Sequence, residues 1–261
     1  MDEHVQNLEA AEKAALGVLG QQLAGHLGVA GGTFNLVNVI LGRAPEVPVR
    51  QVSPARAVAT ALLLRLAGDL RCVAFLAPRG YPLQAVTLVA SMYEAAYTMG
   101  AIGTDNDTAQ RWLDHDYPTR PFFSNIQSLT LDVLNKMGHA NPEEQVRLEY
   151  QVYRQLCMGK HANPLLQQQH GFLRLENALA AVVGPTTGEE AERAGSFALE
   201  HGTRFAQMGA DSFLRHHVPA DRRGNLPETL VGLGRQRLHL HEQAMARGWD
   251  KDPTPGRWRL E

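Results

Sequence analysis

Apolar residues recur at helical spacing through almost the whole of this chain, and no convincing set of alternating apolar and polar positions predicts strands. Two places mark helix starts strongly. Ser53-Pro54 joins a capping serine to a proline preset for the first helical turn, and Asn141-Pro142 repeats that arrangement ahead of two carboxylates. We therefore predict an all-α fold, a helical bundle of about eight helices joined by short loops.

The boundaries of the predicted helices come from apolar stripes and from the glycines and prolines between them. Residues 28–52 are an apolar stretch punctuated by glycine and proline, which predicts a connector, with a short helix inside it as the alternative. Residues 172–183 fit either a helix or a strand, and we favour a helix; another helix is expected to start at Asn163-Pro164. The remaining predicted helices cover residues 5–27, 53–77, 82–102, 107–115, 122–137 (closed by Gly138), 142–159, 189–217 and 227–247.

The composition limits the function classes. A formal net charge of −2 gives no overall basic field of the kind that drives nonspecific nucleic-acid binding, so RNA would need a local basic cleft. Cys72 and Cys157 lie among apolar neighbours, which predicts buried thiols in a reducing compartment. The polar start is no signal peptide, and no run of about 18 apolar residues predicts a membrane span. We expect a cytoplasmic protein.

The histidine clusters do not predict a metal site. His115-Asp116, His216-His217 and His239 with His241 all lack the i, i+4 spacing of zinc ligands on a helix, and no cysteine pair accompanies them. The glycine-rich segment 25–32 follows a helix and lacks the lysine of a phosphate-binding loop. We therefore expect neither a metal nor another cofactor.

The segment that most suggests chemistry runs from Tyr150 to Asn163. It carries Arg154 near the end of a predicted helix, and then Gly159 and His161. A break at Gly159 would let His161 fold back toward the arginine. A guanidinium binds phosphate through paired N–H groups, and an imidazole moves protons near neutral pH. The pair would cleave RNA without a metal, with the 2′-hydroxyl of the substrate as nucleophile. The alternative is a structural pair that ties two helices together.

Two carboxylates on the preceding helices are candidates to support this pair. Asp69 and Glu94 lie beside apolar stripes, where either would pair with Arg154 or orient His161. The alternative is a solvated carboxylate, with Asp69 paired to an arginine of its own helix.

Residues 56–171 resemble the HEPN superfamily of helical bundles, and within it a bacterial branch of unassigned function. The resemblance rests on the helix Ala57–Asp69, on the pattern from Gly80 through Ala85 to Glu94, and on Arg154 with His161, which matches the superfamily's Arg-x4–6-His motif. We accordingly divide the chain into an N-terminal helix and connector (1–52), a HEPN-like core (53–183) and C-terminal helices that pack on it (184–261).

The resemblance implies a function. Many HEPN proteins are metal-independent endoribonucleases of toxin, defence or RNA-processing systems, and they act as homodimers with the motif at the subunit interface. Arg154 and His161 would then be catalytic, Glu94 and Asp69 would support them, and the substrate site would be lined by Tyr150, Tyr153, Lys160 and Asn163. Other members are inactive modules for dimerisation or for binding a protein partner or nucleotide, which is the alternative function. This chain departs from the active pattern at Gln155, where a shorter polar residue is common.

Overall fold

The computed structural model describes the chain except for residues 1–2, 117–120, 161–171, 176–177, 182–183 and 250–261. The described part contains ten α-helices, which confirms the predicted all-α bundle, together with two short 3-10 turns and one two-stranded sheet. The helices are α1 (Glu3–Gln22), α2 (Ala24–Arg43), α3 (Pro54–Leu76), α4 (Pro82–Ile102), α5 (Asn106–Leu113), α6 (Ile126–Lys136), α7 (Pro142–Lys160), α9 (Glu189–His217), α10 (Ala220–Arg223) and α11 (Leu226–Ala246).

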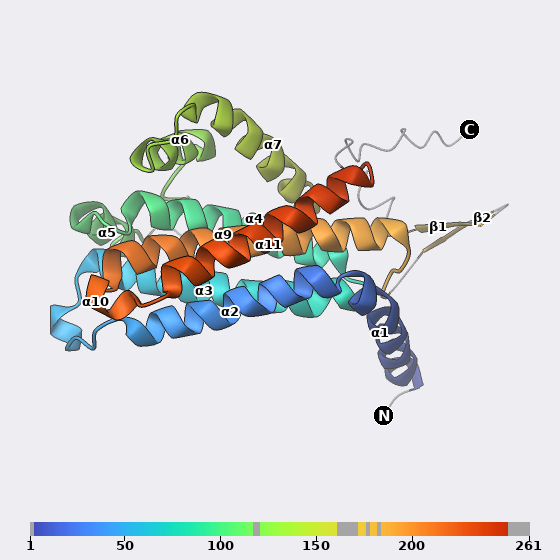
Figure 1. The fold of residues 1–261 in the computed structure, drawn as a ribbon. Helices are drawn as coiled ribbons and strands as arrows, with labels where there is room; N and C mark the ends of the chain where they lie inside the picture. The colour runs from blue at the N-terminus through green and yellow to red at the C-terminus, as the bar shows by residue number, and fades with distance from the viewer. Residues whose placement is uncertain (1–2, 117–120, 161–171, 176–177, 182–183, 250–261) are drawn as a thin grey trace.

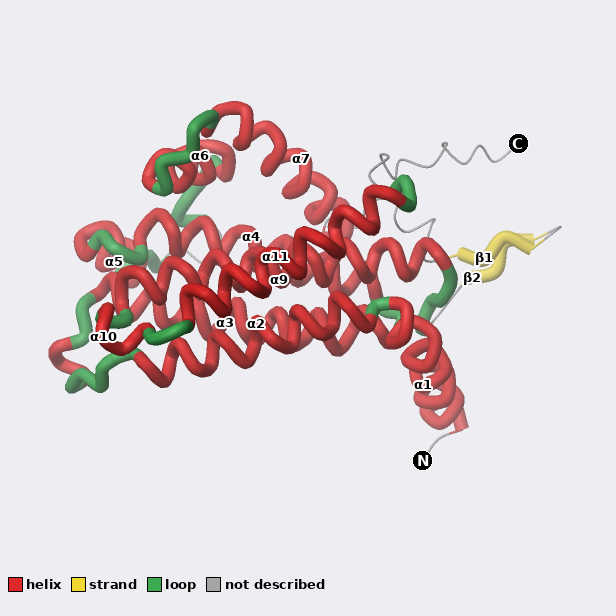
Figure 2. The backbone as a smooth tube through the Cα atoms, in the orientation of Figure 1, coloured by secondary structure: helices red, strands yellow, loops and turns green. Residues whose placement is uncertain are grey.

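Five long helices form the body of the bundle. In Figure 1, α2, α3, α4, α9 and α11 run alongside one another, and α9 packs against each of the other four. Helices α6 and α7 form an arch above α4, and α1 projects from one end of the body. Figure 2 shows the loops (green) gathered at the ends of the helices and the two strands (yellow) extending from the end where α1 lies.

The hydrophobic core draws on all three parts into which the sequence was divided. Its largest fully buried side chains include Tyr93 and Tyr97 from α4 and Phe205 and Phe213 from α9, and Ile40 joins them from α2. Burying one such side chain contributes about 1.5–3 kcal/mol. One continuous core therefore unites the beginning, the middle and the end of the described chain.

Local capping explains where several helices begin. The Ser53 hydroxyl accepts a hydrogen bond from the Arg56 amide at 3.3 Å, so α3 starts at Pro54 as predicted. Helix α7 likewise begins at Pro142. Helix α6 starts four residues later than the predicted Phe122, because the Asn125 side chain accepts from two amides of the first turn and fixes the start at Ile126.

The predicted connector over residues 28–52 is wrong for most of its length, because α2 continues to Arg43. The predicted helix 5–27 is instead divided at Leu23, between α1 and α2. Gly32, one of the glycines that suggested the connector, is a contact point with α11, and so is Gly25 within the predicted helix 5–27. A Cβ at Gly25 or Gly32 would lie 2.8 Å from a methyl carbon of Leu240 or Leu233, respectively. Glycine here lets two helices approach closely and does not end one.

Helix α2 also differs from expectation in its apolar character. Among the described residues it is the one helix whose length and composition would suffice to cross a membrane, and 39% of its apolar window is buried inside the protein. No run of about 18 apolar residues was predicted over this helix. The expectation of two buried thiols is also wrong in part, since Cys72 is exposed and Cys157 is half-buried.

The favoured helix over residues 172–183 is wrong. Phe172–Leu175 (β1) and Ala178–Ala181 (β2) form an antiparallel pair in which Leu175 pairs with Ala178. Four residues are too short a window to separate a strand period from one helical turn, so pairing between the strands decides the outcome. The helix start predicted at Asn163-Pro164 lies outside the described residues.

We predict that Gly80→Ala will destabilise the protein by about 2 kcal/mol or more. Gly80 has a φ of 83°, and a Cβ there would lie 2.6 Å from the Thr186 carbonyl oxygen. The Thr186 amide also donates to the Gly80 carbonyl at 2.9 Å, so the two backbones cannot move apart without losing that bond. Urea unfolding followed by circular dichroism measures the loss.

Gly138 provides a matched control for that substitution. It also has a positive φ, 69°, but a Cβ there would meet nothing within 4 Å. Gly138→Ala should therefore cost only the conformational penalty, about 1 kcal/mol. Equal losses at the two positions would contradict the close backbone contact at Gly80.

Candidate functional site on α7

Arg154 lies on the exposed side of α7 and has no hydrogen bond or ion pair with any other described residue. Its predicted partner His161 and the predicted lining residue Asn163 lie outside the described residues. The convergence of Arg154 on His161 therefore stays a prediction. What the structure places is the helix that carries Arg154 up to Lys160, the residue before the histidine.

Glu94 connects α4 to the end of α7. Its Oε1 accepts a hydrogen bond from the Tyr153 hydroxyl at 2.7 Å and lies 3.0 Å from Lys160 Nζ. Burial, reinforced by the bond to Glu94, raises the pKa of Tyr153, so its hydroxyl stays protonated and donates. The Tyr150 ring stacks on that of Tyr153 with centroids 6.4 Å apart. Glu94 thus faces α7, but it contacts Tyr153 and Lys160 and not Arg154.

Asp69 lies on α3, next to Arg65. The two side chains form an i, i+4 ion pair on α3, with Arg65 Nε 3.7 Å from Asp69 Oδ2. Burial raises the pKa of Asp69, and Arg65 opposes the shift. The observed pair matches the alternative in which Asp69 interacts along its own helix.

Helix α7 is helical at Gly159 and is described through Lys160, so its end lies within one residue of the predicted one, while the fold-back of His161 expected after Gly159 lies outside the described residues. A Cβ at Gly159 would lie 3.3 Å from Thr87 Oγ1 and from Val86 Cγ1, so the glycine marks a close approach of α7 to α4. As in α2, the glycine lets two helices pack closely.

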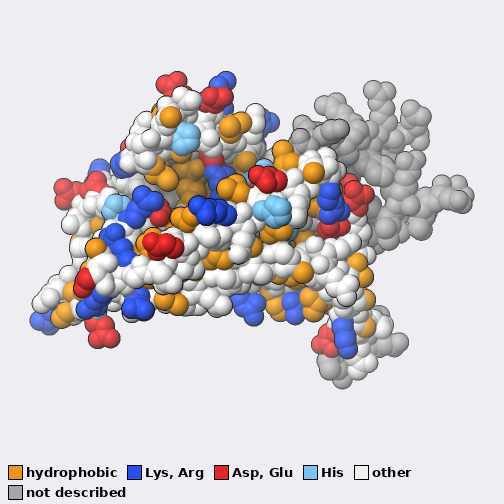
Figure 3. All heavy atoms as spheres, in the orientation of Figure 1, with side chains coloured by type: hydrophobic (Ala, Val, Ile, Leu, Met, Phe, Trp, Pro, Cys, Tyr) orange, Lys and Arg blue, Asp and Glu red, His pale blue; other side chains and the backbone are white. Residues whose placement is uncertain are grey.

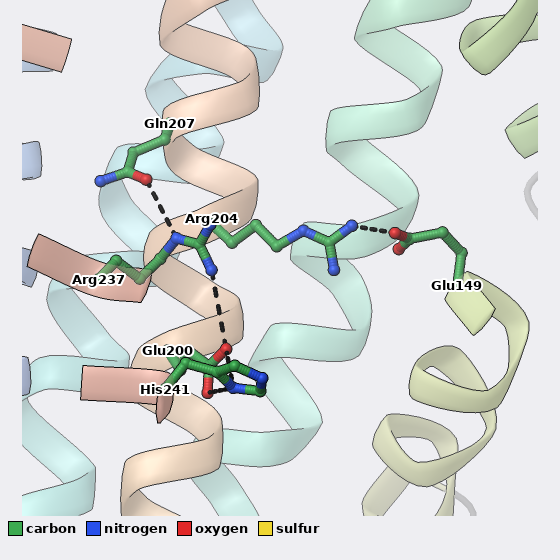
Figure 4. Close-up of polar contacts among 6 residues, drawn as sticks. All are labelled: Glu149, Glu200, Arg204, Gln207, Arg237 and His241. Carbon is green, nitrogen blue, oxygen red and sulfur yellow. Dashed lines mark hydrogen bonds and ion pairs between the residues drawn. The ribbon is translucent and has the colours of Figure 1, made fainter. Parts of the chain in front are cut away.

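A buried polar cluster that joins α7, α9 and α11 was not predicted from the sequence. Figure 4 shows Arg204 reaching from α9 to Glu149 on α7, while Arg237 on α11 points to Gln207 and Glu200, and His241 also meets Glu200. We call these six residues the inner polar cluster: Glu149, Glu200, Arg204, Gln207, Arg237 and His241.

Glu149, which is paired with Arg204, is the most buried side chain of this cluster. The Glu149 side chain is 2% exposed and that of Arg204 23%. Burial opposes the charge of Arg204, but the attraction of the Glu149 carboxylate, the hydrogen bond to it and the nearby Tyr97 and Tyr93 together raise the pKa of Arg204. Gln145 donates to the same carboxylate oxygen at 2.8 Å, and the other oxygen, Oε2, accepts no hydrogen bond from the described residues. The pair ties the α7 arch to the central helix.

The Glu200 side of the cluster joins α9 to α11. Arg237 Nε donates to Gln207 Oε1 at 3.3 Å, and its Nη1 lies 3.7 Å from Glu200 Oε1. His241 Nδ1 lies 3.0 Å from the same Glu200 oxygen. Gln207 also donates to Thr33 of α2 at 3.1 Å. Three helices distant in sequence are therefore held together by polar contacts in a largely apolar interior.

His201 lies beside this cluster and is held neutral. Its ring is buried, contacts Phe197 edge-on at 4.5 Å and stacks on Phe205 at 6.2 Å. Burial lowers the pKa of His201 well below its usual value, and the nearby positive charge of Arg204 adds to the effect. Its Nδ1 has no hydrogen-bond partner among the described residues.

One signal in the sequence would have pointed to the cluster. Glu200, Arg204 and Gln207 are spaced i, i+4 and i+7, which places three polar side chains on one face of the predicted helix. Their partners on α7 and α11 are at least 30 residues away in sequence, so the spacing alone names no partner.

The inner polar cluster and the predicted site residues around Arg154 differ in the chemistry that they can support. The inner polar cluster matches two arginines with two carboxylates and is mostly enclosed, which suits a structural role. Figure 3 shows the surface hollowed between the α6–α7 arch and the body, with hydrophobic side chains (orange) inside. Within the described part of the chain, no group of three or more metal-ligating side chains comes together. Arg154 is the site residue whose guanidinium is open to solvent for an anion.

Comparisons with known proteins add no relative. No family model matches the chain, no curated protein matches it, and no solved structure matches it. The resemblance to HEPN proteins accordingly rests on the motifs in the sequence.

Proposed function

We propose that this protein is a metal-independent endoribonuclease of HEPN type that acts as a cytoplasmic homodimer in a toxin or defence context. The observation that carries the proposal is Arg154: an exposed guanidinium, uncommitted to any described residue, on the helix that leads directly into His161. An arginine with free N–H groups is the preferred side chain for binding a phosphodiester.

The proposed reaction needs two functions from the protein. The 2′-hydroxyl of the RNA attacks the adjacent phosphorus and the 5′-oxygen leaves, so the products are a 2′,3′-cyclic phosphate and a free 5′-hydroxyl. His161 moves the proton between the attacking and leaving oxygens, and Arg154 stabilises the charge on the phosphoryl oxygens.

The neighbouring side chains would hold the RNA. Tyr150 offers a ring on which a base stacks, and Asn163 supplies a polar group next to His161. Tyr153 and Lys160 are held by Glu94, so we assign them to positioning the end of α7 as well as lining the site. Asp69, paired with Arg65 on α3, has no direct part in this arrangement.

The test is cleavage of a mixed single-stranded and structured RNA pool in excess EDTA. The parent protein should cut and leave 2′,3′-cyclic phosphate ends. His161→Ala should lose about 10²–10⁴-fold in rate, and Arg154→Ala about 10²–10³-fold. Arg147→Ala is the matched control, since Arg147 is also exposed and lies seven residues earlier on the same helix face. It should change the rate less than tenfold.

Two results would contradict the proposal. A folded parent that leaves the RNA pool intact is not a ribonuclease for these substrates. Cleavage that persists in His161→Ala shows that the assigned residues are not the ones that act.

A second candidate is a non-catalytic HEPN-like module for dimerisation, or for binding a protein partner or nucleotide. The observation that favours it is that Glu94 already engages two of the predicted substrate-binding side chains, Tyr153 and Lys160. Fluorescence anisotropy with labelled RNA separates the two functions. Binding that weakens in Arg154→Ala without any cleavage by the parent supports the module and contradicts the ribonuclease.

A further inference from the structure

The outer side of α3 carries an apolar stripe. It consists of exposed residues spaced at three or four positions, with Leu64 55% and Phe75 47% exposed. The other sides of α3 pack against α2, α4, α5 and α9, so this side is the one left without a neighbour among the described helices. We call it the α3 stripe, and its members are Ala61, Leu64, Gly68, Cys72 and Phe75.

The α3 stripe is symmetric about Gly68. Leu64 and Cys72 lie four residues to either side of it, and Ala61 and Phe75 lie seven residues to either side. When two copies of such a helix pair antiparallel across a two-fold axis at Gly68, each large side chain faces a smaller one. Leu64 of one copy then faces Cys72 of the other, and Phe75 faces Ala61.

Gly68 fits the crossing point of such a pair. A Cβ there would meet nothing within 4 Å in the single chain, so neither the packing of its own chain nor the backbone requires a glycine at this position. A mid-helix glycine costs about 0.5–1 kcal/mol relative to alanine. A small residue on an outer face lets a second helix approach closely.

The charges beside the stripe favour a second copy over an unrelated partner. Arg65 and Asp69 lie on one flank of the stripe, with side chains 56% and 22% exposed. In the antiparallel pairing, this flank of one copy meets the same flank of the other. Arg65 of one copy is then offset from Asp69 of the other by two residues, about 3 Å along the helix axis, which an arginine side chain spans.

Within one chain the Asp69 carboxylate is only partly engaged. Arg65 Nε is 3.7 Å from its Oδ2, which is buried and accepts no hydrogen bond from the described residues, and Arg65 Nη2 donates to Ser91 Oγ on α4. The arginine of a second copy would therefore approach the exposed part of the carboxylate. Arg71, exposed on the opposite flank, would be offset from its own copy by six residues, about 9 Å, which limits their repulsion.

We propose that the α3 stripe is a self-association surface through which two copies of this chain pair antiparallel, crossing at Gly68. The proposal does not rest on ribonuclease activity. It takes the α3 stripe as the interface of the homodimer, in place of the contact at the α7 motif that the HEPN resemblance implies.

Disulfide trapping tests the register directly. Gly68→Cys in a Cys72→Ala background should form an interchain disulfide under mild oxidation, because a disulfide requires Cα atoms about 4.4–6.8 Å apart. Gly28→Cys in the same background is the control. Gly28 is also an exposed helical glycine whose Cβ would meet nothing within 4 Å, but it lies on α2. It should give no trapped dimer.

Light scattering after size exclusion tests the association itself. The parent should have twice the chain mass of 28.7 kDa, and Gly68→Arg should have the mass of one chain. Because a residue other than glycine favours the helix at this exposed position, the variant should keep the circular dichroism and unfolding midpoint of the parent.

Each remaining outcome overturns the proposal. A parent that has the mass of one chain by light scattering at about 100 µM protein, a concentration far above a micromolar Kd, does not self-associate through this surface. A dimer that survives Gly68→Arg and is not trapped through Gly68→Cys pairs through another surface. Binding of the monomer to phospholipid vesicles, lost in Leu64→Arg, would mean that the stripe meets a membrane.

Discussion

Replacing Arg204 with methionine should lower the free energy of unfolding by about 3–5 kcal/mol. The substitution removes the guanidinium but leaves the Glu149 carboxylate in place, 2% exposed and with Gln145 as its remaining hydrogen-bond donor. A buried charge without its counterion bears the full cost of desolvation. Urea unfolding followed by circular dichroism gives the number directly.

The double variant tells whether the loss comes from the stranded charge. When Glu149 and Arg204 are both replaced by methionine, neither buried charge of this pair is left, and stability should return to within about 1 kcal/mol of the parent. If the double variant is as unstable as Arg204→Met alone, packing and not charge explains the loss. The exposed control is Arg215→Met, which breaks an i, i+4 pair with Asp211 and should cost less than about 1 kcal/mol.

Mild acid should destabilise the protein through histidines that the fold keeps neutral. Burial lowers the pKa of His26, His201 and His217 from the ordinary value of 6.5, although Glu200 partly offsets the shift at His26 and a bond to the Gly103 carbonyl partly offsets it at His217. Below pH 6.5 the unfolded chain binds protons that the folded chain does not. The contribution of these histidines to the free energy of unfolding is therefore fully present above pH 6.5 and is lost as the pH decreases below it.

The size of this effect follows from proton linkage. Each histidine contributes at most about 1.4 kcal/mol per pH unit, and the three together at most about 4 kcal/mol per pH unit. Asp69 acts in the opposite direction, because burial raises its pKa above 3.8 and the folded state then binds a proton more readily. Unfolding midpoints in urea between pH 8 and pH 5.5 measure the sum.

His201→Phe separates the contribution of one histidine. The ring fits between Phe197 and Phe205 and removes the titrating group, while Asp69 on α3 is left unchanged. At pH 8 the free energy of unfolding of the variant should lie within about 1.5 kcal/mol of that of the parent. Below pH 6.5 it should fall less steeply than that of the parent, by about 1.4 kcal/mol per pH unit. An unchanged slope would mean that His201 is not kept neutral by the fold.

The sequence predicted elements whose causes are local. Ser53-Pro54 and Asn141-Pro142 start α3 and α7 as expected, because a cap and a first-turn proline act within one turn of the helix. It failed where the cause lies on another helix. Gly25 and Gly32 fit beneath Leu240 and Leu233 of α11, more than 200 residues later, and nothing near either glycine in sequence reveals that contact.

The candidate site was likewise predicted only in part. The Glu94 side chain does face the end of α7, as the apolar surroundings of that position suggested. Its partners Tyr153 and Lys160 differ from the predicted Arg154, because the choice among neighbouring side chains depends on how α7 is rotated against α4. The Glu149–Arg204 pair spans 55 residues and was not predictable from the spacing of either residue.

The central position of α9 has a consequence for synthesis on the ribosome. The helices α2, α3 and α4 emerge first with apolar faces that α9, residues Glu189–His217, later covers. Until those residues have left the exit tunnel, the nascent chain shows much of its future core to solvent. The nascent chain therefore passes through a partly folded intermediate whose exposed apolar surface is of the kind that molecular chaperones bind.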